Sequence, residues 1–468
     1  MPRPNLLFVL ADQLRRDASG YVGSPVGATP NIDQFASESV DFTNAVSGYP
    51  VCGPYRNSLF TGKYPSSTGM VVNELRCMPD DDAMGHCLAR AGYDTHYIGK
   101  WHLYGRDHTP EEQYCPPGPH RLGFDGYWAS YNFHHSYYSA FYYEDTFERH
   151  EVDGYEPDVH TDMLLSRLAE RDGDRPFAAV INYGTPRDPW TWDNVPESHT
   201  RGYRTRSFGY PRTYREGSAE YWSPRMDAAW WRDHVAPNVP VWQQIYHAMI
   251  DNLDWNFGRL MRGLDALGLR EDTLVVFTSD HGEMFGAHGR IAKKVFYDEA
   301  VRVPMLMRLP GATQDGSSDV CLDTPDIMPT LFGLLGLPTA DSVEGMDLSC
   351  HARGDAGPAP AAALMQGMGH TYQWVDGDEW RALRDERYTF AVTRHDGQEY
   401  LFDNVEDPMQ ERNLAADTAA RPLLRNRREQ LSERMNALND TVHPTTYYRD
   451  AWTRDRCIIR TATRESQH

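Results

Sequence analysis

The chain has 468 residues, of which 40% are hydrophobic and 24% are charged, an ordinary composition for a globular protein. This length allows one large core or about two to three domains of ordinary size. Forty-six basic and sixty-seven acidic residues give a formal net charge of −21 at pH 7. Such a charge opposes binding to nucleic acid, to anionic membrane surfaces and to long polyanions. A small anionic substrate would need a locally positive pocket.

Five short apolar runs are typical of buried β-strands, and longer helical patterns separate them. The runs cover residues 5–11, 94–99, 177–183, 273–278 and 304–309. Strands that alternate with helices predict an α/β domain with a large, mostly parallel central sheet that helices cover on both faces.

Two helices have clear sequence signals. The Thr29-Pro30 pair is typical of an N-cap followed by the first helical turn, and it predicts a helix that runs through Val40. Apolar residues recur every three or four positions over residues 245–264, which predicts a long amphipathic helix with Gly268 as its C-terminal cap.

Aromatic residues crowd two regions, residues 127–143 and residues 190–231. Neither region shows a helical or strand period, so we expect long loops there rather than packed core. Flat aromatic faces in such loops suit a sugar or an aryl group, although surface packing explains them equally well.

The C-terminal part differs in character. Residues 354–363 are rich in Gly, Pro and Ala and mark a boundary, and short strand-like pieces and one helix follow them. We therefore expect a catalytic α/β domain over residues 1–355, an antiparallel-sheet-plus-helix subdomain over residues 364–450 and a tail over residues 451–468.

The seven cysteines, at positions 52, 77, 87, 115, 321, 350 and 457, are too few and too irregularly spaced for a disulfide framework or a zinc ribbon. No apolar run of about 18 residues occurs, and the first residues lack the regions of a signal peptide. From these features we expect reduced thiols, no membrane association and a cytoplasmic location.

Polar residues follow two of the predicted strands. Asp12 and Gln13 come directly after the first, and Asp280 and His281 come after the fourth. Because parallel strands end at the same edge of a sheet, these side chains should meet there. Two carboxylates, an amide oxygen and an imidazole could hold one divalent cation.

The segment from Cys52 to Gly62 carries the most specific signal. Its pattern, C-x-P-x-R-x-x-apolar-apolar-T-G, resembles the signature of type I sulfatases, in which the cysteine is oxidised after translation to formylglycine, the catalytic nucleophile. Taken alone, Cys52 could also be a buried structural thiol.

Further blocks extend the resemblance along the chain. Residues 4–13 and 29–33 are similar to the first strand and first helix of the family, and residues 99–103 match its G-K-W-H-L block. Residues 279–283 with Lys293, and residues 401–414, are similar to its second metal segment and its C-terminal part. The resemblance implies an alkaline-phosphatase-like fold and a sulfuric ester hydrolase.

From the residues and this resemblance we expect three groups of site residues. The metal would be calcium, because the shell is rich in oxygen, with manganese or magnesium as alternatives that a histidine ligand allows. The expected catalytic residues are Cys52, Arg56, Lys100, His102 and Lys293; the substrate-binding residues are Arg187, Asn73, His134 and His135; the metal ligands are Asp12, Gln13, Cys52, Asp280 and His281.

Two departures from the family pattern bear on the chemistry. Gln13 stands where most members carry a second aspartate, a variation that resembles choline-sulfatase and phosphonate monoester hydrolase relatives. Arg187 stands where many sulfatases have a histidine. Because a guanidinium cannot donate a proton near neutral pH, His102 becomes the expected donor to the leaving oxygen.

The leading hypothesis is a sulfatase that acts on a small sulfated substrate, which the aromatic regions suggest is a sulfated sugar. It would need a formylglycine-generating maturase as a partner, and the sequence does not indicate an oligomeric state. One alternative is a phosphonate or phosphate diester hydrolase on the same scaffold. Another is a catalytically inactive, carbohydrate-binding relic.

Overall fold

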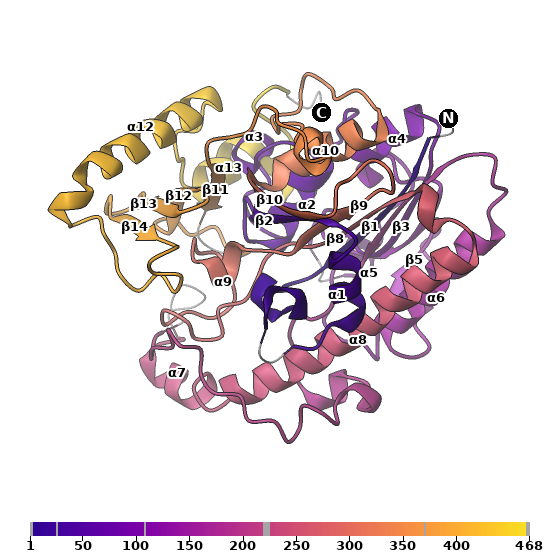
Figure 1. Cartoon of the computed structure of the whole chain (residues 1–468), viewed down its shortest axis with the longest axis horizontal. Helices are drawn as coiled ribbons and strands as arrows, with labels where there is room; N and C mark the ends of the chain where they lie inside the picture. The colour runs from indigo at the N-terminus through magenta and orange to yellow at the C-terminus, as the bar shows by residue number, and fades with distance from the viewer. Residues whose placement is uncertain (1–2, 25–26, 107–108, 219–224, 369–370, 465–468) are drawn as a thin grey trace.

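The computed structural model describes residues 3–24, 27–106, 109–218, 225–368 and 371–464. Its centre is a ten-stranded sheet with the strand order β10-β2-β9-β8-β1-β7-β3-β4-β5-β6 (Figure 1). The strands are β1 Asn5–Ala11, β2 Val40–Ala45, β3 Asp94–Lys100, β4 Tyr127–Tyr131, β5 Phe141–Tyr143, β6 Arg149–Glu151, β7 Phe177–Asn182, β8 Thr273–Ser279, β9 Met305–Arg308 and β10 Gly316–Leu322.

The large, mostly parallel sheet predicted from the sequence is confirmed. All five predicted strands are present, as β1, β3, β7, β8 and β9. Strand β1 lies at the centre and pairs in parallel with β7 and β8, whereas β9 runs antiparallel to both of its neighbours. The apolar runs therefore predicted the positions of the most buried strands. They did not predict that β9 runs antiparallel to its neighbours.

One predicted helix is shorter than expected. Helix α1 spans Pro30–Ala36, and Val40 already belongs to β2. In β2 buried and half-buried residues alternate, as they do in a strand with unequal faces. This period of two was overlooked because Val40 also continues the helical spacing of α1.

Helices cover both faces of the sheet (Figure 1), and β1 shows how its two faces are used. Leu6, Phe8 and Leu10 belong to a core shared with α2 Cys52–Thr61, α4 Met84–Arg90 and α10 Thr324–Leu335. Leu7 and Val9 belong to a second core shared with α1, α6 Glu156–Glu170 and α8 Val239–Ala266. Because successive strand residues point to opposite faces, a continuous apolar run is what a sheet buried on both sides requires.

The long amphipathic helix is confirmed as α8, which ends at Ala266. Gly268 follows in the left-handed region with φ of 68°, as expected of a residue just beyond a helix. On the face of α8 towards β1, Leu253, Phe257 and Leu260 are fully buried.

The loop prediction for residues 127–143 was wrong in part. Strands β4 and β5 occupy the two ends of this region, and Trp128, Tyr131, Tyr137 and Tyr143 are each at most 2% exposed. Trp128 stacks on Tyr97 of β3, and Tyr143 meets Phe141 edge-on, so the rings form core without a regular period. Within the described residues, the region 190–231 is mainly irregular, with α7 Ala228–His234 at its end.

A separate four-stranded antiparallel sheet lies towards the C-terminus, as the sequence predicted. It consists of β11 Ala363–Met368, β12 Glu379–Arg384, β13 Tyr388–Thr393 and β14 Glu399–Asp403. Helix α12 Arg421–Ala437 packs on it through Leu424 and Leu431. The sequence prediction omitted β11, and the division into domains at residues 355 and 364 stays a prediction.

The last described residues form α13 Thr445–Trp452 and a small hairpin of β15 Thr453–Arg454 and β16 Cys457–Ile458. The backbone carbonyl of Arg456 accepts a hydrogen bond from the N–H of Arg76. This part of the expected tail is therefore tied to the residues that follow Asn73. The remaining α-helices are short: α3 Pro65–Thr68, α5 Pro110–Gln113, α9 Asp298–Val301 and α11 Ser349–Ala352.

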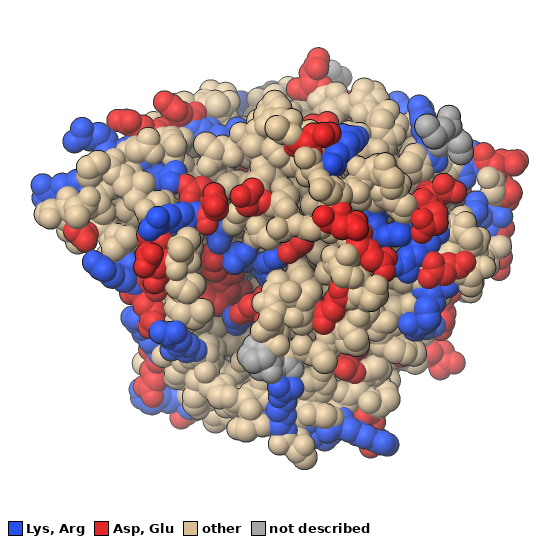
Figure 2. Space-filling model, viewed as in Figure 1, with Lys and Arg blue, Asp and Glu red and all other residues tan. Residues whose placement is uncertain are grey.

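On the face shown in Figure 2, acidic and basic side chains are intermixed and form no continuous basic tract. This distribution agrees with the expectation that the surface does not attract long polyanions. None of the described helices combines the length and the apolar character needed to cross a membrane.

Candidate active site

Four neighbouring strands end in polar side chains at one edge of the sheet. Along the order β8-β1-β7-β3, the residues at or just after the ends are Asp280, Asp12, Asn182 and Lys100. Gly99 allows the close approach of β3 to β7, because a Cβ there would lie 2.1 Å from the carbonyl oxygen of Asn182. The sheet thus brings the predicted polar residues together, as the crevice rule for open α/β sheets expects.

Cys52 is the first residue of α2, a helix in which every residue is buried. The N–H of Gly53 donates to Oδ1 of Asn73 at 2.8 Å, and a Cβ at position 53 would lie 3.0 Å from that oxygen and 3.3 Å from the carbonyl oxygen of His102. A Cβ at position 53 would therefore need these neighbours to shift by a few tenths of an ångström. The N-terminus of α2, with its positive end, therefore faces the site where an anion would bind.

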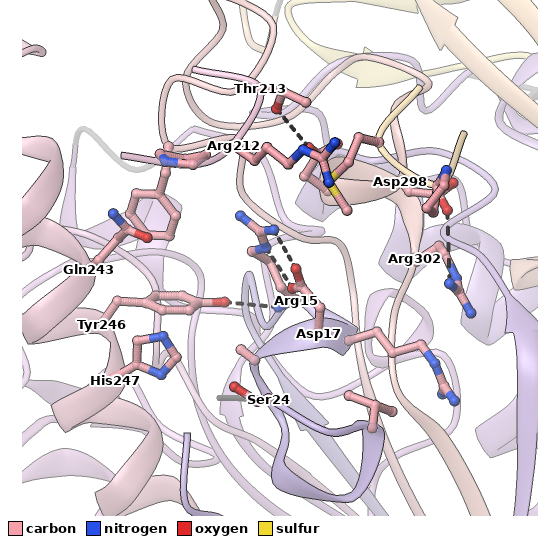
Figure 3. A pocket seen from close by; sticks show the side chains of 18 residues that line it. Arg15, Asp17, Ser24, Arg212, Thr213, Gln243, Tyr246, His247, Asp298 and Arg302 are labelled. Carbon is pink, nitrogen blue, oxygen red and sulfur yellow. Dashed lines mark hydrogen bonds and ion pairs between the residues drawn. The ribbon is translucent and has the colours of Figure 1, made fainter. Parts of the chain in front are cut away.

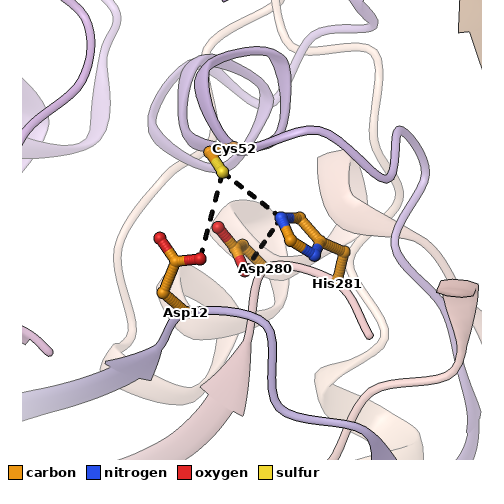
Figure 4. A group of neighbouring side chains, drawn as sticks. All are labelled: Asp12, Cys52, Asp280 and His281. Carbon is orange, nitrogen blue, oxygen red and sulfur yellow. Dashed lines mark hydrogen bonds and ion pairs between the residues drawn. The ribbon is translucent and has the colours of Figure 1, made fainter. Parts of the chain in front are cut away.

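Four predicted metal ligands form one buried cluster (Figure 4). One ligand atom from each of Asp12, Cys52, Asp280 and His281 lies within 4.8 Å of all the others. Sγ of Cys52 is 3.3 Å from Nε2 of His281 and 3.9 Å from Oδ1 of Asp12. Two buried carboxylates and an imidazole in this arrangement fit a divalent cation, which would offset their charge.

Arg56 connects the two carboxylates of this cluster. Its guanidinium is 2.6 Å from Oδ2 of Asp280 and 3.3 Å from Oδ2 of Asp12, and it also donates to Oδ1 of Asn182 at 3.2 Å. Burial and the neighbouring Asp12 raise the pKa of Asp280 above its usual value, while Arg56 opposes this rise. All three charged side chains are fully buried.

Lys100 and Lys293 add positive charge on opposite sides of Asp12 and Gln13. The ammonium of Lys100 contacts Oδ2 of Asp12, and that of Lys293 donates to Oε1 of Gln13 at 2.8 Å. Burial alone would raise the pKa of Asp12, but Lys100 and Arg56 hold it well below its usual range. Since the amide oxygen of Gln13 already accepts a hydrogen bond, its role as a metal ligand stays a prediction.

His102 lies beside the nucleophile position in a strained conformation. Its φ of 59° is in the left-handed region, which is costly for a non-glycine residue and common at functional sites. Burial lowers the pKa of His102 to about 3, although its hydrogen bond with Cys52 opposes this shift. Burial would raise the pKa of Cys52, but Lys100, Lys293 and His281 bring it well below its usual value.

The four predicted substrate-binding residues do not all lie together. Nη1 of Arg187 lies 2.9 Å from Nδ1 of His135, and its Nε lies 3.8 Å from Oδ1 of Asp12, so these two belong to the site. His134 turns elsewhere: its Nε2 is 3.1 Å from Oε2 of the buried Glu156. Asn73 contacts the N-terminus of α2 at Gly53, as described above.

With the geometry established, comparisons with known proteins give the family. The Sulfatase family model matches residues 4–337, and the model described as N-sulphoglucosamine sulphohydrolase, C-terminal, matches residues 286–438. The chain belongs to the sulfatase family. It is 35% identical to an ulvan-active sulfatase of Formosa agariphila over 455 residues, which cover 95% of this chain and 84% of that protein.

Two solved structures show the same fold. The first is a complex with the substrate D-glucosamine-2-N,6-O-disulfate, with a TM-score of 0.81, 22% identity and coverage of 95% and 99% of the two chains. The second is a phosphonate monoester hydrolase of Silicibacter pomeroyi, with a TM-score of 0.74, 20% identity and coverage of 94% and 96%. The resemblance predicted from the sequence is therefore confirmed, and the chain is a sulfuric ester hydrolase.

Sulfatases generally use a metal ion and a formylglycine, and the buried cluster suits both. The sulfur of Cys52 occupies the position of the oxygen that formylglycine would carry. Asp12, Asp280 and His281 would hold the metal ion, whose positive charge would polarise that oxygen.

The sequence analysis missed three residues of this sulfatase site. Asn182 holds Arg56 and donates to the carbonyl oxygen of Lys100 at 2.6 Å, Glu283 accepts from Nε2 of Gln13 at 2.6 Å, and Phe133 lies against His102. The strand-end rule could have found Asn182, because it closes β7. Glu283 lies inside the block 279–283 that resembles the second metal segment, but the resemblance gave it no role, and Phe133 has no local signal that separates it from the other rings of its region.

A separate cavity of about 440 Å³ is lined by Arg15, Asp17 and Tyr246, among others (Figure 3). Arg15 in its wall is paired with Asp17. The hydroxyl of Tyr246 accepts from the N–H of Arg15 at 2.8 Å and donates to the carbonyl oxygen of Gln13 at 2.9 Å. This cavity thus borders the back of the loop that carries Gln13, and none of the predicted site residues lines it.

Proposed function

We propose that the protein releases sulfate from a small sulfated sugar by means of a formylglycine formed from Cys52. The observation that supports this most strongly is the convergence of Cys52, the acidic cluster and two lysines at one sheet edge. The sugar is supported by relatives whose names or substrates are saccharide sulfates, together with the aromatic side chains near the site. The acidic surface favours a small ester over a long polyanion.

Each residue of the site has its own proposed role in the reaction. The aldehyde at position 52 would be hydrated to a geminal diol, one hydroxyl of which would attack sulfur and displace the alcohol. The second hydroxyl would then lose its proton, expel sulfate and re-form the aldehyde. Lys100 and Lys293 would stabilise the negative charge that develops on the sulfate oxygens, and Arg187 would bind the same group from the side of His135. These cations lie where the N-terminus of α2 also points.

We propose that His102 delivers the proton to the leaving oxygen. Because its pKa is about 3 without substrate, the imidazole is neutral near pH 7 and can donate a hydrogen bond but holds no extra proton. A bound sulfate ester would favour the protonated form, since an anion beside an imidazole raises its pKa. Arg187 cannot replace it as an acid.

One experiment tests this function directly. The protein is produced together with a formylglycine-generating maturase, the peptide that contains Cys52 is analysed by mass spectrometry, and turnover of an aryl sulfate is compared with that of an aryl phosphonate. We expect conversion of the thiol to the aldehyde and faster cleavage of the sulfate. Faster phosphonate cleavage would favour the diesterase alternative, and an unmodified thiol with no turnover would favour the inactive relic. The Cys52→Ala variant is the control.

Calcium is our proposed ion, because three of the predicted ligands offer oxygen. Reloading the metal-free enzyme separately with calcium, manganese and magnesium tests this choice. A cytoplasmic location also remains a proposal, which fractionation of the producing cells can test.

A further inference from the structure

The ring of Phe133 contacts the cationic side chains of the proposed sulfate pocket. Nζ of Lys100 lies 4.7 Å from the ring centroid, and the guanidinium carbon of Arg187 lies 4.8 Å from it. The imidazole of His102 stacks on the same ring with a centroid distance of 4.4 Å and an interplanar angle of 22°. His135 meets the ring edge-on at 4.3 Å. One half-buried aromatic side chain therefore touches four groups of the site.

The position of this ring is set by the fold rather than by the groups that it touches. Gln113, the last residue of α5, is 7% exposed. Its Oε1 accepts from the N–H of Phe133 at 2.9 Å, and its Nε2 donates to the carbonyl oxygen of Phe133 at 2.6 Å. A primary amide that binds both backbone groups of one residue fixes that residue in place.

The ring of Phe133 can attract two neighbouring cations before an anion binds. Lys100 and Arg187 repel each other, and each also lies beside a carboxylate: Lys100 contacts Asp12, and Nε of Arg187 is 3.7 Å from Oδ1 of Asp188. The negative face of an aromatic ring attracts ammonium and guanidinium groups without forming a salt bridge that a substrate would have to break. The neutral imidazole of His102 is held by stacking on the same ring rather than by its charge.

We propose that Phe133 is a positioning residue that holds Lys100, Arg187 and His102 in the arrangement that receives the sulfate group. The proposal rests on the sulfatase function proposed above. Without the ring, Lys100 and Arg187 would lose an attraction that competes with that of Asp12 and Asp188, and the imidazole would lose the surface that orients it. Binding of the sulfate group and turnover should both suffer.

The test compares Phe133→Leu, which removes the ring, with Phe133→Tyr, which keeps it. The parent protein and both variants are each produced together with the maturase, and their formylglycine content is measured. The kcat and KM of each protein are then determined with an aryl sulfate. Binding of inorganic sulfate is measured by calorimetry as a readout that needs no turnover. Phe147→Leu is the matched control, because Phe147 is 50% exposed and stacks on Tyr143 outside the site.

We expect Phe133→Leu to lower kcat/KM about tenfold and to weaken sulfate binding by a similar factor, the size of a partly desolvated cation–π contact. Phe133→Tyr should stay within about threefold of the parent. Unchanged kinetics in Phe133→Leu, or equal losses in the leucine and tyrosine variants, would overturn the proposal. If Phe133→Leu does not fold, Phe133→Met fills similar volume without a ring and replaces it. A parent that cleaves no sulfate ester refutes the proposed function, while the sulfate-binding comparison still decides the role of Phe133.

Discussion

Replacing Arg56 with methionine should destabilise the protein in a way that depends on pH and on metal. The guanidinium of Arg56 is fully buried and faces two buried carboxylates, at 2.6 Å for Asp280 and 3.3 Å for Asp12. Methionine is of similar length but carries no charge. The variant therefore leaves two carboxylates without this partner in a low-dielectric environment.

The expected magnitude follows from these contacts. Removing one partner of a buried ion pair costs about 3–5 kcal/mol. Lys100 still contacts Asp12 in the variant, so we expect the lower end, a loss of about 3 kcal/mol in the free energy of unfolding at pH 7. In the variant the pKa of the Asp280 carboxyl should rise further above that of the unfolded chain, so stability falls as pH rises through it. The loss should therefore be smaller at pH 5 than at pH 7.

Urea unfolding at both pH values, with a chelator and with added calcium, measures these effects. Calcium should recover part of the loss, because a divalent cation can neutralise Asp12 and Asp280. The control is Arg381→Met, which breaks a buried pair with Asp440 away from the metal cluster and should not respond to calcium. A loss below about 1 kcal/mol at pH 7, or an identical response of both variants to calcium, would show that Arg56 does not balance these carboxylates.

Three further predictions concern charge and metal. Lys100→Gln should lower kcat about 100-fold with little change in formylglycine content, since it removes a donor to the developing charge, and an unchanged kcat would exclude that role. Removal of metal by a chelator should abolish turnover. Calcium at about 100 times its Kd should restore turnover and raise the free energy of unfolding by about 2.7 kcal/mol. Full activity without metal would contradict the assignment of the buried acidic cluster as a metal site. Glu156 has its pKa raised to about 8 by burial, so the folded parent loses stability as pH rises from the unfolded pKa through 8. Glu156→Gln lacks this titration, so its free energy of unfolding minus that of the parent should increase by about 2 kcal/mol from about pH 6.5 to about pH 8, as measured by urea unfolding. A difference that stays constant over this range would show that Glu156 is ionised throughout it.

The sequence was most informative where local chemistry and burial coincide. Strands β1, β3, β7 and β8 are buried on both faces, so they appear as continuous apolar runs, and their ends located Asp12 and Asp280. Strands β2 and β10 are of similar length but partly exposed, and their patterns resemble those of helices or loops over a few residues.

What the sequence determined by itself was the chemistry: the motif around Cys52, the lysines and the acidic residues at strand ends are local patterns that one chain displays. What only the tertiary structure decided was how these residues meet. His134 and His135 are adjacent in sequence, yet one faces Glu156 and the other Arg187. In the sequence, nothing distinguishes Phe133 from the other aromatic residues of 127–143. Its contacts with Lys100 and Arg187 arise because a sheet edge joins segments distant in the chain, and no local pattern records that proximity.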